Sequence, residues 1–545
     1  MNYDPKLYSY PSRRSAVYGT RGMVCATQPL AAQAGLDILK KGGNAMDAAV
    51  AAAACMTVLE PTSNGLGGDG FAIICTEGKL YGLNSSGPAP RLASVEAMRK
   101  KGYSAIPARG WDAVTVPGVT AGWAAIRRRF GRLSMEELLA PAVSYAEAGF
   151  PVTPVVSELW SRAEKIFPAC RELTPAQRER WSRLFLIAGK DGTRHAPAPG
   201  EIFRSPLHAQ TLRELARTDC ESFYRGELAE KIDAASREEG GALRKEDLAA
   251  FEPEWVDPIH IGYRGHKVWE LPPNGIGIVA LMTLGILGDR AYPQGGHDDI
   301  EVIHRQLEAL KLAFADANRY ITDRREMAVT PAELLDPAYL ASRRALIREE
   351  AVSPEAGDPC CGGTVYLCTA DREGNMVSYI QSNYLGFGSG IVIPETGIAL
   401  HDRGVSFSLD EQAANHLRPG RRPFHTIIPG FLTEGDGTPI GPFGVMGAYM
   451  QPQGHVQVIM NTLDFHMNPQ QALDAPRWQW TGGKTVELEP GADGDLVRAL
   501  RARGHDIKVA PDSLSFGRGQ IIWRDKNGVL CGATEPRADG TVAVW

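Results

Sequence analysis

The chain contains three stretches in which apolar residues recur every three or four positions, as they do on the buried face of a helix. Residues 30–41 form the first and end at two consecutive glycines, which predicts a helix with a defined C-terminal stop. Asn44 then caps a second, alanine-rich helix over 45–59. The clearest pattern lies at 301–320, where the predicted buried stripe consists of Ile303, Leu307, Leu310, Leu312, Phe314 and Ala315.

Other stretches are typical of strands. After a glycine-dense turn at 61–70, the runs 71–75 and 79–83 predict a hairpin, and 134–245 is mostly helical in pattern. Six later runs predict strands: 365–370, 376–381, 391–393, 426–432, 520–523 and 542–545. Strands, then helices, then strands favour an α+β fold with two stacked sheets between helical layers, and exclude simple βαβ alternation.

Composition indicates a globular protein. The chain has 545 residues and a mass of 59.0 kDa, with 43% hydrophobic and 22% charged residues. That length fits two or three ordinary domains or one large layered domain. The net charge of −6 provides no basic field for nucleic acid or anionic lipid, so neither is expected as a partner.

The cysteines and the chain start indicate a cellular compartment. Nine cysteines are scattered without a Cys-x-x-Cys pair, which predicts free thiols in a reducing environment. The adjacent Cys360 and Cys361 fit a loop dipeptide, with a redox role as the alternative. The N-terminus lacks a secretory pattern, and the longest apolar stretch, 45–59, is shorter than the ~20 residues of a membrane span. These features predict a soluble cytoplasmic protein.

Several motifs can be set aside. The glycine-rich segment 65–70 lacks the Lys-Ser/Thr pair of a phosphate-binding loop and precedes a strand. The twelve histidines are dispersed, with no His-Glu-x-x-His motif, so no metal and no cofactor is expected. Ser389 lacks the neighbours of a serine nucleophile elbow, and 386–390 is better interpreted as a turn.

Thr364 is the candidate nucleophile. It follows Gly362 and Gly363 and opens a strand-like run. A threonine hydroxyl needs a base, and scission just before Thr364 would supply an α-amine with a pKa of about 8. Glycines lack Cβ atoms, so the backbone can bend and expose the Gly363 carbonyl to the hydroxyl. The alternative is a β-branched residue that simply begins a strand.

The chain resembles the γ-glutamyltransferase family, N-terminal-nucleophile (Ntn) hydrolases made as self-cleaving proenzymes. The resemblance covers nearly the whole length and rests on 43–49, 60–68, 116–118, 272–276, 313–316, 387–390 and 475–477. It implies an αββα sandwich and cleavage between Gly363 and Thr364. The products would be a large chain, 1–363, and a small chain, 364–545, which associate as one structural domain.

The resemblance also implies roles for individual residues. Thr364 Oγ would attack the substrate amide, with its own α-amine as the general base. The backbone N–H groups of Gly447 and Ala448 match the family's oxyanion hole. Asn383 lies near a substrate-contacting asparagine, and Gln381 lies one residue away from a threonine that hydrogen-bonds the nucleophile.

Departures from the family pattern concern the substrate pocket. Members that act on glutathione hold the α-carboxylate with an arginine, which is missing from 84–88, and with a serine pair, replaced here by His425 and Thr426. Ser406 stands in place of the aspartate for the α-ammonium, and Arg403 in place of a glutamine. The reversed charge predicts an acyl group without an ammonium, or one with an anionic group near Arg403 and His425. The alternative is a structural ion pair for Arg403.

Three functions follow from these patterns. The first is a self-cleaving hydrolase or acyltransferase for γ-glutamyl-type amides such as glutathione. The second is an amidohydrolase for an acyl group without the α-amine, of the oxamate amidohydrolase or glutaryl/cephalosporin acylase type. The third is an uncleaved, non-catalytic relative that acts as a binding or scaffold protein. For the enzymes the partner is a small-molecule amide; a homodimer remains open.

Overall fold

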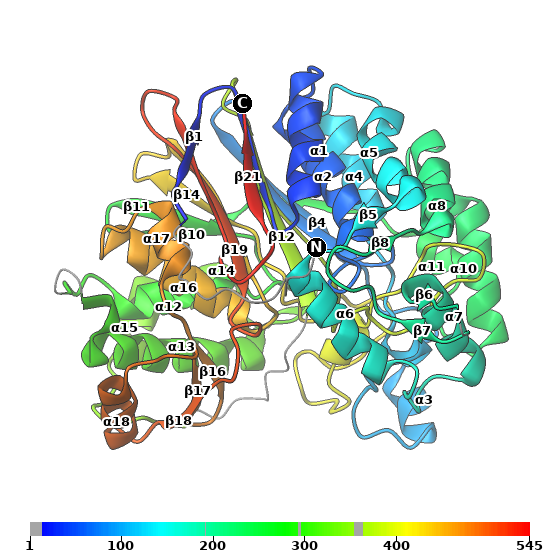
Figure 1. The fold of residues 1–545 in the computed structure, drawn as a ribbon. Coiled ribbons are helices and arrows are strands. Elements are labelled where there is room, and N and C mark those ends of the chain that lie inside the picture. Colours follow the sequence, from blue (N-terminus) through cyan, green and yellow to red (C-terminus); the bar gives the residue numbers. More distant parts are fainter. Residues whose placement is uncertain (1–13, 191, 293–295, 354–362) are drawn as a thin grey trace.

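The fold is an αββα sandwich. The structure is a computed structural model that describes residues 14–190, 192–292, 296–353 and 363–545. Two seven-stranded sheets stack face to face, and helices cover the outer face of each (Figure 1). The first sheet has the order β21 (Thr541–Val544), β2 (Gly22–Ala26), β12 (Gly363–Asp371), β13 (Met376–Tyr384), β3 (Asp69–Thr76), β4 (Lys79–Ser85) and β9 (Glu254–Val256).

The second sheet packs on the first through large apolar side chains. Its order is β1 (Val17–Gly19), β20 (Leu530–Thr534), β19 (Arg518–Arg524), β15 (Pro439–Met446), β14 (Gly430–Glu434), β11 (His266–Glu270) and β10 (Ile259–Tyr263). Neighbouring strands are antiparallel in both sheets. Between the sheets lies a core that includes Phe71, Ile73, Tyr366, Ile380 and Phe431.

Each sheet is covered by its own group of helices. Against the first sheet pack α1 (Pro29–Lys40), α2 (Ala45–Leu59), α4 (Val119–Phe130) and α5 (Met135–Ala148). All fifteen residues of α2 are buried, so its alanines allow close helix packing, and Asn44 closes its start with a capping box. Against the second sheet pack α12 (Gly277–Leu287), α13 (Ile300–Tyr320), α16 (Met450–Leu463) and α17 (Pro469–Asp474).

Strand β12 fixes the position of Thr364. It lies between β2 and β13 in the middle of the first sheet and is apolar on both faces. Val365 packs with the outer helices, whereas Tyr366 packs between the sheets. Since side chains alternate along a strand, Thr364 shares the inter-sheet side with Tyr366.

Most of the strongly patterned elements are confirmed. The hairpin is β3–β4, and the three helices are α1, α2 and α13, although Ala315 is only partly buried. The strand predicted at 391–393 is wrong, because only one isolated bridge, Val392 to Ala399, forms there. The strand predicted at 426–432 begins only at Gly430.

The structure also bears on the expectations about the cysteines and about membrane spans. The seven cysteines that the structure describes are all free thiols, while Cys360 and Cys361 lie outside the described residues. Among the described helices, none has both the length and the apolar character needed to cross a membrane.

Candidate active site

Thr364 lies at the start of β12 with its hydroxyl next to that of Ser382. Its side chain is buried (1% exposed), and its Oγ1 lies 3.0 Å from Ser382 Oγ. The backbone N–H of Tyr384 donates to Ser382 Oγ at 2.7 Å. Gly363 pairs with Tyr384 across a register shift, and this bulge brings Ser382 to Thr364.

The contact predicted near Gln381 belongs to Ser382 instead. Gln381 points toward the outer helices, where its amide donates to the Ala53 carbonyl at 2.8 Å and to Asn64 Oδ1 at 2.7 Å. Successive strand residues face opposite sides, so Gln381 and Ser382 cannot both reach Thr364. Sequence reasoning missed Ser382, and the one-residue discrepancy in spacing was the signal.

Asn383 faces the glycine-rich loop that precedes β3. Its backbone N–H donates to the Ser63 carbonyl at 3.2 Å. A Cβ on Gly68 would stand 2.9 Å from Asn383 Oδ1, so glycine permits the close approach of loop and side chain. Asn383 Oδ1 is buried without a hydrogen-bond partner among the described residues, and it is therefore an acceptor available to a ligand.

Arg403 is a buried cation whose hydrogen-bonding capacity is mostly unused. Its side chain is fully buried, and Nη1 donates to Thr426 Oγ1 at 2.9 Å. Nε and Nη2 have no partner, and Arg403 forms no ion pair with any described residue. Its guanidinium carbon lies 4.1 Å from the ring centre of Tyr384, the cross-strand partner of Gly363. Burial lowers the pKa of Arg403.

His425 is neutral and held by Asp69. Its Nε2 donates to Asp69 Oδ2 at 2.9 Å, because Nδ1 accepts from the Ile427 backbone N–H at 3.3 Å. Burial lowers the pKa of His425 to about 3, and Arg403 adds to this effect. Burial would raise the pKa of Asp69, but His401 and His425 outweigh it and hold that pKa below its ordinary value.

The second buried carboxylate beside Arg403 is also engaged. Asp402 Oδ2 accepts from Arg109 Nη1 at 2.8 Å, and Oδ1 accepts from the Leu385 N–H at 3.0 Å. Burial raises the pKa of Asp402 to about 6 against the lowering effect of Arg109. Ser406 is partly exposed, and its hydroxyl has no partner among the described residues. Both Asp69 and Asp402 therefore already accept hydrogen bonds from protein groups.

The loop between β15 and α16 carries two backbone donors. Gly447 has φ +139°, and Ala448 has φ +51°, a left-handed value that is uncommon outside glycine. In the described part of the chain, neither N–H donates a hydrogen bond. Strand β15 crosses β12 at close range: a Cβ on Gly444 would lie 2.4 Å from the Tyr366 ring. This contact places the loop near the start of β12.

A buried Glu–His pair supports that loop from behind. His455 Nδ1 donates to Glu270 Oε1 at 2.6 Å, and the Val445 N–H donates to His455 Nε2 at 3.1 Å. Val445 lies two residues before Gly447, so the pair helps to fix where β15 ends. Burial raises the pKa of Glu270. Sequence reasoning did not identify either residue, because they are 185 positions apart.

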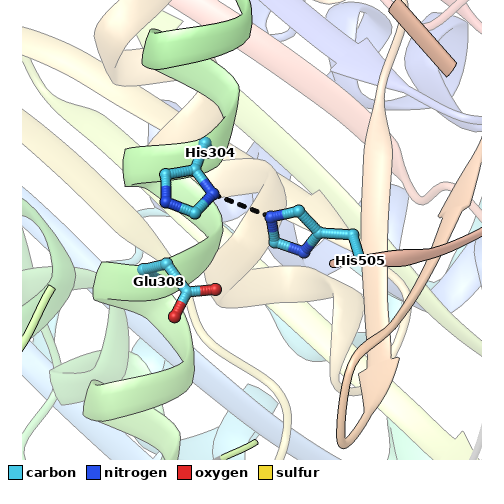
Figure 2. Close-up of side chains that lie close together, drawn as sticks. All are labelled: His304, Glu308 and His505. Atoms are coloured by element: carbon cyan, nitrogen blue, oxygen red, sulfur yellow. Dashed lines mark hydrogen bonds between the residues drawn. The ribbon is translucent and has the colours of Figure 1, made fainter. Parts of the chain in front are cut away.

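Three potential metal ligands meet elsewhere, on the opposite side of the second sheet. His304 and Glu308 lie one turn apart on α13 and face His505, with their ligand atoms within 4.8 Å of one another (Figure 2). His304 Nδ1 accepts from His505 Nε2 at 2.9 Å, since its Nε2 donates to the Arg348 carbonyl. Lys311 Nζ lies 2.7 Å from Glu308 Oε1. The ammonium of Lys311 thus already occupies the place of a cation beside Glu308.

The fold and the position of Thr364 define the protein class. Two antiparallel sheets between helical layers, with a threonine at the start of a central strand, form the fold of the Ntn hydrolases. The family model for gamma-glutamyltranspeptidase matches residues 31–545. The chain belongs to the γ-glutamyltranspeptidase family.

Relatives of the chain differ in the amide that their names specify. It is 37% identical to the "Glutathione hydrolase-like YwrD proenzyme" of Bacillus subtilis over 96% of this chain and 98% of that protein. It is 38% identical to the "Oxamate amidohydrolase proenzyme" of Klebsiella pneumoniae over 97% and 99%. The solved cephalosporin acylase from Bacillus halodurans is 54% identical, with a TM-score of 0.95 over 100% and 99%. The chain is thus similar to enzymes of the family, several of them named as proenzymes.

Proposed function

We propose that this protein is a self-cleaving amidohydrolase for amides whose acyl group carries a free carboxylate and no α-ammonium. Scission between Gly363 and Thr364 would give chains 1–363 and 364–545 and leave Thr364 as the N-terminal nucleophile. The observation that carries the substrate assignment is Arg403, a buried guanidinium with two unused donors next to the strand of Thr364.

The charge argument is direct. An unpaired buried cation is destabilising by several kcal/mol, and a carboxylate is the group that best matches two guanidinium N–H donors. Asp69 and Asp402 stabilise Arg403 only through space and make no direct contact with it, so a ligand carboxylate would be its direct partner. The stacking of Tyr384 on Arg403 and the Thr426 bond hold the guanidinium in one orientation.

In the proposed reaction, Thr364 Oγ attacks the amide carbonyl while the α-amine takes the hydroxyl proton. The N–H groups of Gly447 and Ala448 receive the developing oxyanion, with each donor contributing about 3 kcal/mol to the transition state. The α-ammonium returns the proton to the leaving nitrogen, and the amine departs. Water then attacks the threonine ester, which releases the dicarboxylic acid and restores the nucleophile.

The second candidate is a γ-glutamyl hydrolase or transferase. It is favoured by the family membership and by the name of the Bacillus subtilis relative. A γ-glutamyl group needs an anionic partner for its ammonium, and Ser406 is uncharged. The ammonium would also lie in the field of Arg403, which repels it. For these reasons we place this candidate second.

The test compares two substrates that differ only in the ammonium group. Glutaryl-p-nitroanilide and γ-glutamyl-p-nitroanilide share the reacting bond, and mass spectrometry of the same sample reports scission at Gly363. We expect a scission product beginning at Thr364 and a kcat/KM at least tenfold higher for the glutaryl compound. Preference for the γ-glutamyl compound would overturn the substrate assignment. An uncut chain that remains active would exclude Thr364 as an N-terminal nucleophile. An uncut, inactive chain would favour the scaffold alternative.

A further inference from the structure

A cavity of about 460 Å³ adjoins the proposed oxyanion loop. It lies between α6 (Pro154–Ile166), the loop after β13 and the segment 510–518. Met446 and Gly447 line it directly, so one wall is the loop that would bind the oxyanion. The cavity is therefore placed to receive one side of the scissile amide.

The amine side of the amide is the side that fits. Arg403, which we assign to the acyl carboxylate, does not line the cavity, whereas Arg109 does. Arg109 donates to Asp402, the residue before Arg403, so this pair links the cavity wall to the segment that carries Arg403. An acyl group anchored at Arg403 would thus leave its amine pointing toward the cavity.

The cavity offers apolar contacts beside several charged side chains. Its apolar walls include Leu159, Ala163, Ile166, Phe167 and Leu514. Ile166 is 51% exposed, so its side chain is accessible to a ligand in the cavity. Three arginines at the wall are paired: Arg109 with Asp402, Arg162 with Asp512 at 3.0 Å, and Arg518 with Glu60 at 3.3 Å. Glu487 also lines the cavity and forms no ion pair with any described residue.

The volume of the cavity distinguishes between two kinds of leaving group, ammonia and a larger amine. A primary amide releases ammonia, which needs the room of one water molecule, about 30 Å³. A volume of about 460 Å³ falls instead within the ~300–1,000 Å³ of ligand pockets. We infer that this cavity is the leaving-amine subsite and that it takes amines with an apolar, ring-sized body. The inference rests on the proposed function and narrows it toward acylase-type substrates.

The experiment fills the cavity and varies only the leaving group. Each acyl group is supplied as a primary amide and as a p-nitroanilide, using glutaryl, oxalyl and γ-glutamyl series. The variants are Leu159→Trp and Ile166→Trp, with Ile202→Trp as the control. Ile202 is 43% exposed and does not line this cavity, so it matches Ile166 in residue type and exposure.

We expect both cavity variants to raise KM for the anilide about tenfold while the primary amide of the same acyl group stays within twofold. The control should change neither substrate. Equal effects on both leaving groups, or no effect on either, would overturn the inference. The ratio is read on whichever acyl series the wild-type protein cleaves, so a wrong acyl assignment is detected separately. Absence of turnover in all three series would overturn the proposed function and this inference together.

Discussion

Two buried arginines, Arg403 and Arg477, meet opposite surroundings. Arg477 is 3% exposed, and its Nη2 lies 2.9 Å from Glu535, while Nη1 donates to the carbonyls of Phe516 and Gly517 at 3.0 Å each. Arg403 is buried to the same degree, but its only hydrogen-bond partner among the described residues is the hydroxyl of Thr426. The first charge has a direct ion-pair partner, whereas the second has none among the described residues and interacts with Asp69 and Asp402 only through space.

This difference separates structure from function. Burial alone would raise the pKa of Glu535, but Arg477 and Arg537 outweigh it and keep the carboxylate ionised, which gives a closed ion network. Such a network is complete without a ligand. A buried guanidinium with two unused donors is complete only when an anion arrives. Burial of charge is thus informative about function only when the partners are counted.

The largest effect on activity is expected from a substitution of Thr364. Thr364→Ala removes the proposed nucleophile, so turnover should fall by about 10⁴-fold or more and the chain should stay in one piece. Electrophoresis and anilide turnover measure both. Thr364→Ser, which keeps a hydroxyl, is the control and should still be cut. Turnover by an intact Thr364→Ala protein would show that another group is the nucleophile.

Breaking the closed network should cost stability. Arg477→Leu leaves Glu535 with less compensation, and we expect the free energy of unfolding to fall by about 3 kcal/mol. Chemical denaturation of the mature protein measures this loss. A loss of activity without a loss of stability would contradict the structural role of Arg477.

The matching change at the open site should cost activity instead. Arg403→Leu removes the carboxylate anchor, so kcat/KM for the glutaryl anilide should fall about 100-fold, equivalent to about 3 kcal/mol. Stability should stay level or rise, because an unpaired buried charge is gone. Arg403→Lys keeps the charge without the fork and should be intermediate. If Arg403→Leu destabilised the protein as much as Arg477→Leu, the distinction between the two regions would fail.

The smallest effect concerns the oxyanion loop. Ala448 has a left-handed backbone, which costs roughly 1 kcal/mol for a residue with a Cβ. Ala448→Gly should relieve this strain but increase the conformational freedom of the unfolded chain. The free energy of unfolding, measured by thermal denaturation, should therefore change by only about 1 kcal/mol in either direction. Activity should stay within twofold. A tenfold loss would mean that the Ala448 methyl group contacts the substrate.

Local patterns predicted the outer parts of the molecule well. The helices α1, α2 and α13 and the hairpin β3–β4 each carry their own periodicity and caps, so the sequence contains their signals. The run 391–393 is apolar and buried but lacks a neighbouring strand, because burial also occurs in a packed loop. Strand formation depends on a partner that a local pattern cannot specify.

For the same reason, the sequence predicted only some of the residues that come together in the structure. Thr364 stands out through its own neighbours, whereas Ser382 reaches it through a bulge that shifts the register by one residue. His304 and Glu308 show helical spacing, but His505 lies 201 positions from His304 and enters only through the fold. The unpaired state of Arg403 likewise depends on the distant residues that surround it.

The strand order of the sheets has a consequence for the life of the protein. In the first sheet, β12, β13 and β21 come from beyond Gly363, while β2, β3, β4 and β9 come from before it. The second sheet mixes both halves in the same way. A cut at Gly363 would therefore break the polypeptide but leave the fold together, because strands from each half pair with strands from the other half. Neither fragment would have a complete sheet of its own, so the proposed cleavage would have to follow assembly of the sheets.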